Sequence, residues 1–117
     1  MIKRRNKYHA RPTVVDGIKF ASKAEARRYQ GLQVLERDGK IRLLRCHPRF
    51  ALIPGFTYQE KRIRPAYYEA DFSYHENGQF VVEDVKGAIE TPVFKLKWKL
   101  MKSLYPDWDF RIYRQGE

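Results

Sequence analysis

Two aspartates, Asp71 and Asp84, lie within two strand-like runs that flank an Asn-Gly turn, in the stretch YEADFSYHENGQFVVEDVKG (residues 68–87). Asn-Gly favours a two-residue type I′ hairpin turn, which places Asp71 opposite Asp84 and puts Lys86 on the same face as Asp84. Two carboxylates can hold Mg²⁺ or Mn²⁺ through hard oxygen ligands, and a neighbouring ammonium can contact a phosphate oxygen or a water. The pattern therefore indicates phosphodiester hydrolysis, because the ammonium also offsets charge that grows in the transition state.

Other interpretations of the same stretch remain open at this point. A three-residue turn would shift the register by one residue and oppose Asp71 to Glu83 instead. A purely structural alternative pairs Glu69 with Lys86 across the strands and leaves both aspartates facing solvent. Facing acids destabilise a strand pair, and acids within strands rich in valine and aromatic residues are costly to bury without a cation. These costs favour the metal-site interpretation.

Two helices and several strands must position these acids. One helix is predicted to begin at Ser22, with Glu25 three residues later as its capping-box partner, and to end at Asp38-Gly39. A second is predicted with Thr91 as its N-cap and Pro92 at its first position. The expected strands are a small hairpin about Asp16-Gly17, residues 41–53 with a break at Pro48, one or two strands in 57–75, then 79–87 and 108–114. This order predicts an α/β or α+β layer fold in which helices cover a mixed sheet.

Two side-chain patterns follow from these elements. Along a continuous strand, Tyr68 and Ala70 share a face with Phe72 and Val81. In the second helix, Leu96 and Leu100 are expected to pack inward, while the neighbouring lysines form a cationic face for phosphates. The candidate nucleic-acid contacts on the helices are Arg27, Arg28, Lys95, Lys97 and Lys99, with ordinary solvated helix faces as the alternative.

The net charge of the chain indicates which class of partner it binds. The chain of 117 residues carries a formal charge of +10, and such a basic surface implies an anionic partner, with nucleic acid the leading candidate. Residues 1–12 are predicted to form a basic flexible arm on phosphates, and residues 13–117 a single domain. An acidic membrane surface is the weaker alternative, because the arm lacks an apolar face. The cations of the arm are Lys3, Arg4, Arg5, Lys7 and Arg11.

Composition predicts a soluble, intracellular, cytoplasmic protein. No apolar run approaches the roughly 18 residues that span a bilayer, and the N-terminus lacks the apolar core of a signal peptide. Cys46 is the only cysteine, so no internal disulfide can form. His9, His47 and His75 have no ligand-like spacing, so a structural zinc site is not expected.

The ordered pattern SKAE on a first helix, YEAD at a strand end, EDVKG on the next strand and a basic helix afterwards resembles the PD-(D/E)XK nuclease superfamily. Within it, the chain is most similar to small phage-encoded proteins related to archaeal-type Holliday junction resolvases. The resemblance covers about residues 12–113 and implies a restriction-endonuclease-like fold with an αβββαβ core. Ala70 stands before the motif aspartate where the family name has proline.

The resemblance also implies roles. Asp71 becomes the motif aspartate and Asp84-Val85-Lys86 the (D/E)-X-K tripeptide, so that Asp71 and Asp84 bind Mg²⁺ or Mn²⁺ and the Val85 carbonyl can join them. Lys86 would orient or activate the attacking water. Glu25 would complete the metal shell, although its capping-box role alone suffices to explain its identity.

The function that this implies is a metal-dependent endonuclease acting on branched or duplex DNA during phage recombination, replication or packaging. A homodimer is expected, because a chain with one site must dimerise, or act twice, to cut both strands. Two alternatives stay open: a non-catalytic DNA-binding module that uses the same basic surface, and an accessory subunit whose site works only inside a larger assembly.

Overall fold

The computed structural model describes residues 11–87 and 89–114 and is a mixed α+β structure, which confirms the predicted fold class. In this part of the chain the helices are α1 (Lys23–Arg37) and α2 (Pro92–Leu104), and neither is long and apolar enough to cross a membrane. The strands are β1 (Thr13–Val15), β2 (Ile18–Phe20), β3 (Arg42–Cys46), β4 (Arg49–Ile53), β5 (Phe56–Tyr58), β6 (Lys61–Ile63), β7 (Ala66–Glu69), β8 (Phe72–Glu76), β9 (Gln79–Lys86) and β10 (Asp109–Arg114).

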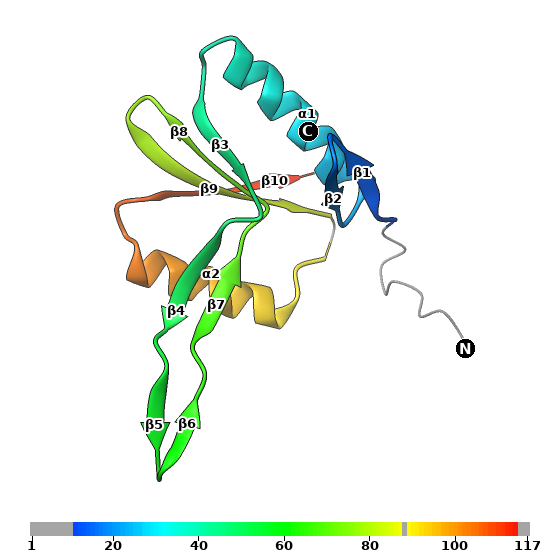
Figure 1. Cartoon of the computed structure of the whole chain (residues 1–117). Coiled ribbons are helices and arrows are strands. Elements are labelled where there is room, and N and C mark those ends of the chain that lie inside the picture. Colours follow the sequence, from blue (N-terminus) through cyan, green and yellow to red (C-terminus); the bar gives the residue numbers. More distant parts are fainter. Residues whose placement is uncertain (1–10, 88, 115–117) are drawn as a thin grey trace, which may run out of the picture.

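A four-stranded sheet in the order β10-β9-β8-β3 forms the centre of the fold, with α1 on one face and α2 on the other (Figure 1). Strands β9 and β10 run parallel and the other neighbours run antiparallel, so the sheet is mixed as predicted. The elements of this layer follow one another as helix, three strands, helix, strand. A crossover through α2 is what allows β10 to lie parallel to β9.

The helix ends follow local capping chemistry. Ser22 Oγ accepts a hydrogen bond from Glu25 N at 3.1 Å, and Thr91 Oγ1 accepts one from Phe94 N at the same distance. Each bond satisfies an N–H that has no partner within its helix. The first helix stops at Gly39, whose φ of +75° needs a residue without a β-carbon. Both predicted helix starts are confirmed.

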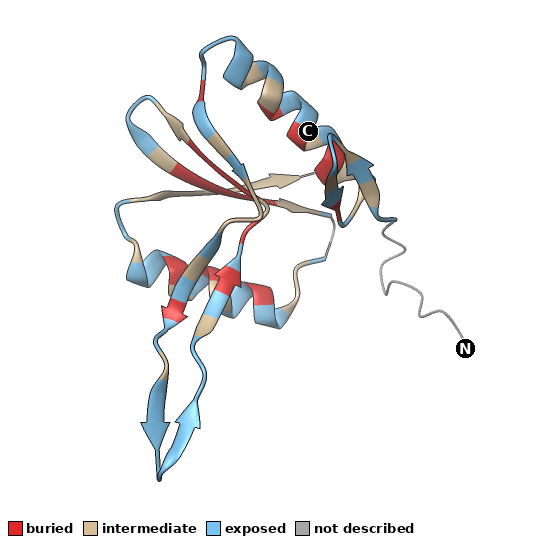
Figure 2. Ribbon diagram, in the orientation of Figure 1, coloured by how far each residue is buried: buried red, intermediate tan, exposed pale blue. Residues whose placement is uncertain are grey.

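Two apolar clusters hold the layers together, one on each face of the sheet (Figure 2). The first joins α1 and the β1–β2 hairpin to the sheet through Phe20, Tyr29, Leu32, Phe72, Tyr74 and Val81, among others. The second joins α2 to the sheet and to β4 and β7 through Leu52, Tyr68, Ala70, Val82, Phe94, Trp98 and Met101. The central sheet therefore has two buried faces.

Two side-chain predictions are wrong. Tyr68 and Ala70 pack in the α2 cluster rather than with Phe72, because the chain bends between β7 and β8 and β7 pairs with β4 instead of continuing the sheet. A period-two alternation cannot carry across that bend. Leu96 is 61% exposed, because the face of α2 that is buried carries Phe94, Trp98 and Met101 instead.

A two-stranded ribbon, β4 with β7, continues into a second hairpin, β5 with β6, that extends away from the body (Figure 1). Tyr105 Oη donates to Ala51 O at 2.8 Å and ties the ribbon to the end of α2. The six residues of β5 and β6 are all exposed, and we call residues 54–65 the hairpin arm (Figure 2). Its turn, at Gln59 and Glu60, was not predicted.

Candidate active site

The hairpin of β8 and β9 has the predicted type I′ turn. Asn77 and Gly78 have φ values of 51° and 78°, and the register pairs Phe72 with Glu83 at the far end of the ladder. Asp71 immediately precedes Phe72, so it stands at the position opposite Asp84. The alternative register, in which Asp71 faces Glu83, is excluded.

Two short hydrogen bonds hold the aspartates where the ladder ends, one between Asp71 and Asp84 and one between Asp71 and Val85. Asp71 N donates to Asp84 Oδ1 at 2.8 Å, and Val85 N donates to Asp71 Oδ2 at 2.7 Å. Each carboxylate thus takes the place of a backbone carbonyl and is fixed in one orientation. The other oxygens, Asp71 Oδ1 and Asp84 Oδ2, make no hydrogen bond within the described residues.

Lys86 lies beside this pair. Its Nζ is 3.8 Å from Asp84 Oδ2 and 3.9 Å from the centroid of the Phe94 ring at the start of α2. The ring holds the ammonium by a cation–π contact, which keeps it next to the carboxylates. The structural alternative is contradicted: Glu69 is paired with Arg49 across β4 and β7 rather than with Lys86, and Asp84 is 2% exposed.

Glu25, at the first turn of α1, is 4% exposed and turns its carboxylate towards His47 rather than towards the helix cap. His47 Nε2 is 2.7 Å from Glu25 Oε1, and His47 N donates to Asp71 O at 2.9 Å. His47 therefore bridges α1 and the aspartate pair. His47 was not among the predicted site residues, because its spacing from the other histidines suggested no ligand role.

Burial raises the pKa of both aspartates. The pKa of Asp71 rises to about 6 through burial and the nearby charge of Glu25, although the Val85 N–H, Lys86 and His47 act in the opposite direction. The pKa of Asp84 rises to about 6 through burial, although Lys86 and the Asp71 N–H act in the opposite direction. Two carboxylates that resist ionisation side by side are a place where a cation would be strongly stabilised.

We expect the free energy of unfolding, measured without divalent cations, to fall as the pH rises from about 4 to about 6. Aspartates of the unfolded chain have a pKa of about 3.9, so Asp71 and Asp84 bind protons more tightly in the folded state. The stability gained from protonation is complete below that value and is lost as the pH passes the folded pKa. The loss should be on the order of 1–3 kcal/mol, measurable by denaturant unfolding in EDTA.

The matched control for this prediction is Asp84→Asn, which removes one titrating group and should reduce the pH dependence. Millimolar Mg²⁺ should raise the melting temperature of the parent at pH near 7.5, where both acids are ionised, and much less near pH 4. A Mg²⁺ shift that is equal at both pH values, or equal in the variant, would contradict a cation site at these acids.

The donor set fits a hydrated divalent cation. Within residues 11–87 and 89–114, no group of three or more histidine, cysteine, aspartate or glutamate side chains is arranged to hold a metal ion. Magnesium does not need such a cage, because it is commonly held by one or two carboxylates with waters and substrate phosphates. Asp71 and Asp84 supply two hard oxygen ligands with uncompensated charge, and Glu25 lies close enough to affect the pKa of both.

The residues predicted to contact nucleic acid differ in how far they are exposed. Lys3, Arg4, Arg5 and Lys7 lie outside the described residues. Arg11, Arg27, Lys95 and Lys99 are exposed, and Lys97 is partly buried. Arg28 is partly buried and its guanidinium forms an ion pair inside the fold, so its predicted phosphate contact stays a prediction.

Arg28 forms a bidentate ion pair with Glu83 on the α1 face of the sheet. The distances are 2.7 Å from Nε to Oε2 and 2.8 Å from Nη2 to Oε1. Tyr74 Oη donates to the same carboxylate at 2.8 Å, and the guanidinium lies 4.0 Å from the centroid of the Tyr113 ring. Glu83, 1% exposed, is thereby fully engaged on the face opposite to Asp84.

Comparisons with known proteins add a family but no activity. A family model described as "Protein of unknown function (DUF1064)" matches residues 5–115, nearly the whole chain. No curated protein matches the chain, and no solved structure does.

Proposed function

The chain belongs to the DUF1064 family, and from its site we propose that it is a metal-dependent DNA endonuclease that hydrolyses phosphodiester bonds in branched or duplex DNA. One observation carries the proposal: two hydrogen-bonded aspartates of raised pKa lie together, and one of them, Asp84, is 3.8 Å from the Lys86 ammonium, in a chain with a formal charge of +10. Hard oxygen ligands and a cation beside them are what phosphodiester hydrolysis needs. The resemblance to PD-(D/E)XK nucleases supports the same roles for Asp71, Asp84 and Lys86.

The side chains have separate tasks in this proposal. Asp71 and Asp84 would hold Mg²⁺ or Mn²⁺ through the oxygens that make no hydrogen bond, with the Val85 carbonyl as a further ligand. When bound, the cation would polarise the scissile phosphoryl group and lower the pKa of the attacking water. Lys86 would donate a hydrogen bond to that water and offset negative charge in the transition state. His47 would keep the Glu25 carboxylate oriented towards the site.

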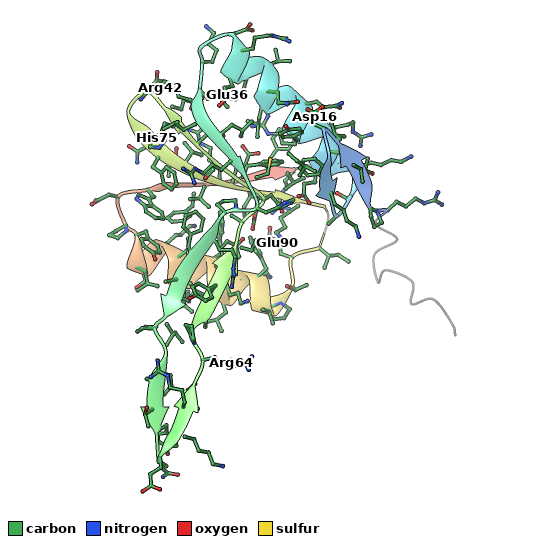
Figure 3. All side chains as sticks on the ribbon, viewed as in Figure 1. Asp16, Glu36, Arg42, Arg64, His75 and Glu90 are labelled. Atoms are coloured by element: carbon green, nitrogen blue, oxygen red, sulfur yellow. The ribbon has the colours of Figure 1, made fainter. Side chains whose placement is uncertain are left out.

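The hairpin arm adds a DNA-binding element that the sequence analysis did not foresee. Its cations Lys61, Arg62 and Arg64 outnumber its one acid, Glu60, and all are exposed (Figure 3 labels Arg64). A two-stranded β-ribbon fits the major groove of DNA, where its cations can contact phosphates. The arm would therefore position the duplex while the β8–β9 hairpin performs the chemistry.

Replacing Lys61, Arg62 and Arg64 of the hairpin arm by glutamine should weaken binding of a duplex. It should also lower the slope of log affinity against log salt by about 2–3, because about 0.9 of a counterion is released per phosphate contact. Fluorescence anisotropy across a salt series measures both quantities. The matched control neutralises Arg37, Lys40 and Arg42, which are exposed at the far end of α1 and on β3. Equal slopes for the two triple variants would contradict a role of the arm in binding.

The test of the proposed function is cleavage of a labelled four-way junction, the matched linear duplex and the single strand with Mg²⁺, Mn²⁺ or EDTA. Metal-dependent cutting would establish the nuclease, and the preferred substrate would define its job. Binding of every DNA without cutting under any metal would favour a non-catalytic DNA-binding module. Two cuts placed symmetrically on a junction would support the homodimer.

A further inference from the structure

A pocket of about 660 Å³ adjoins the candidate active site on the α2 face of the sheet. It opens between the β3–β8 edge of the sheet and the start of β4, and His47 is common to the pocket and the site. Its size lies within the range of about 300–1,000 Å³ that small-molecule sites occupy. The principal lining side chains are Arg45, Arg49, Phe50, Ser73, His75 and Phe80.

The lining has the chemistry of an anion site with apolar walls. Arg45 is exposed and makes no ion pair within the described residues, while Arg49 lies 4.5 Å from the centroid of the Tyr67 ring. None of the described residues that line the pocket is acidic. Phe80 lies against the ring of His75, at 5.1 Å between centroids, and adds an aromatic surface (Figure 3 labels His75).

A second observation indicates a polar ligand. Ser73, 1% exposed, lines this pocket, and its Oγ has no hydrogen-bond partner within the described residues. A buried hydroxyl without a partner is destabilising, and few are retained in folded proteins. An oxygen or nitrogen atom of a ligand in the pocket would give Ser73 the missing bond.

The position of Ser73 relates the pocket to the chemistry. Ser73 is paired with Val82, two positions from the point beyond the ladder where Asp71 meets Asp84, so Ser73 and Asp84 stand on the same face of the sheet. Ser73 and His75 lie two residues apart on β8, a spacing of roughly 6.6 Å, and Asp71 immediately precedes the strand, two residues before Ser73. The phosphate backbone of a DNA strand that passes Asp71 would therefore continue into the pocket.

We propose that this pocket is a subsite for one nucleotide, a phosphate with its base, of an unpaired DNA strand that leads away from Asp71 and Asp84. Arg45 and Arg49 would bind the phosphate, Ser73 would bond an edge of the base or sugar, and the Phe50 and Phe80 rings would contact its face. Cationic grooves with aromatic surfaces are how proteins hold single strands. This inference rests on the proposed function and narrows its substrate to DNA with an unpaired nucleotide at the cut.

The test measures binding in EDTA, so that cleavage does not enter. The probes are a labelled single strand, a duplex with a single-stranded flap and the same duplex without one. The parent should bind the first two more tightly than the third, and Arg45→Gln should lose about 10-fold of that preference, since a hydrogen bond to a charged group is lost. Ser73→Ala should lose a few-fold while its melting temperature stays equal or rises, a combination that a purely structural role would not give.

The matched control is Arg37→Gln, which removes the same charge at the opposite end of α1 from Glu25 and should keep the preference. If Arg45→Gln and Ser73→Ala keep it too, the subsite is wrong, whatever the cleavage experiment shows. Competition separates the two sources of a phosphate: dAMP should displace the single strand better than inorganic phosphate. Equal displacement would overturn the nucleotide assignment. If the variants lose the preference and the parent cuts no DNA, the subsite is supported and the proposed nuclease function is rejected.

Discussion

Asp84→Asn is expected to lower the rate of metal-dependent DNA cleavage by about 10³-fold or more while the fold and DNA binding are retained. Loss of one preorganised electrostatic group in an active site commonly costs about 10²–10³ in rate, and a metal ligand should cost at least as much. Asparagine has nearly the same shape, and its Oδ1 can still accept the 2.8 Å hydrogen bond from Asp71 N. The variant also loses a buried negative charge, so anionic DNA should bind equally or more tightly.

Initial rates on a labelled junction, with anisotropy in EDTA, measure the two effects separately. Glu69→Gln is the matched control, because it makes the same change of charge at an exposed position on β7, close in the chain to Asp71. That control should cleave at close to the parental rate. Cleavage by Asp84→Asn at the parental rate would show that the assigned site is wrong.

Arg28→Ala is expected to reduce the free energy of unfolding by about 3–5 kcal/mol, because it leaves Glu83 buried without its cation. The side chain of Arg28 is 19% exposed and that of Glu83 is 1% exposed, so solvent can replace little of the lost interaction. For a chain of this size the melting temperature should fall by about 10–20 °C. Denaturant unfolding with circular dichroism measures the change.

Arg27→Ala supplies the comparison on the same helix, since Arg27 is exposed and should change stability by no more than about 0.5 kcal/mol. Adding Glu83→Gln to Arg28→Ala should recover part of the lost stability, because it removes the uncompensated charge. Similar stabilities for the two arginine variants would mean that the ion pair is not structural. A loss of DNA affinity at unchanged stability would instead return Arg28 to the phosphate-binding surface.

The local geometry of the aspartate pair was predictable because its turn has a strong sequence signal. Asn77 and Gly78 both tolerate positive φ, and a two-residue turn of that type fixes which residues face each other. The same reasoning located the β1–β2 hairpin at Asp16-Gly17. Helix starts at Ser22 and Thr91 were equally legible from their capping side chains.

The hairpin arm was not predictable for a related reason. Gln59 and Glu60 have φ values of 47° and 67°, the same left-handed region, although neither residue type favours it. No turn signal therefore marks the tip of the arm, although Pro54-Gly55 and Pro65 mark its two ends. The faces of Tyr68 and Ala70 were assigned wrongly for the same cause, since the bend before Asp71 has no glycine or proline to mark it.

The role of His47 depends on contacts that only the fold creates. It meets Glu25, 22 residues earlier, across the space between α1 and the end of β3. The available signal was Pro48, which ends β3 and so places the preceding residue, His47, at a chain break with a φ of 55°. Breaks beside strand ends are where polar side chains most often serve a site.

The two-residue turn between β8 and β9 also determines when the site assembles during folding. Hairpin contacts close a short loop, whereas β10 joins β9 only after the whole of α2 has been crossed, and longer closures cost more entropy. The repulsion between Asp71 and Asp84 therefore opposes an early step of folding, before β10 docks against β9. Protonation, or a divalent cation, should then act mainly on the folding rate rather than on the unfolding rate, so this protein would fold fastest under conditions that neutralise Asp71 and Asp84.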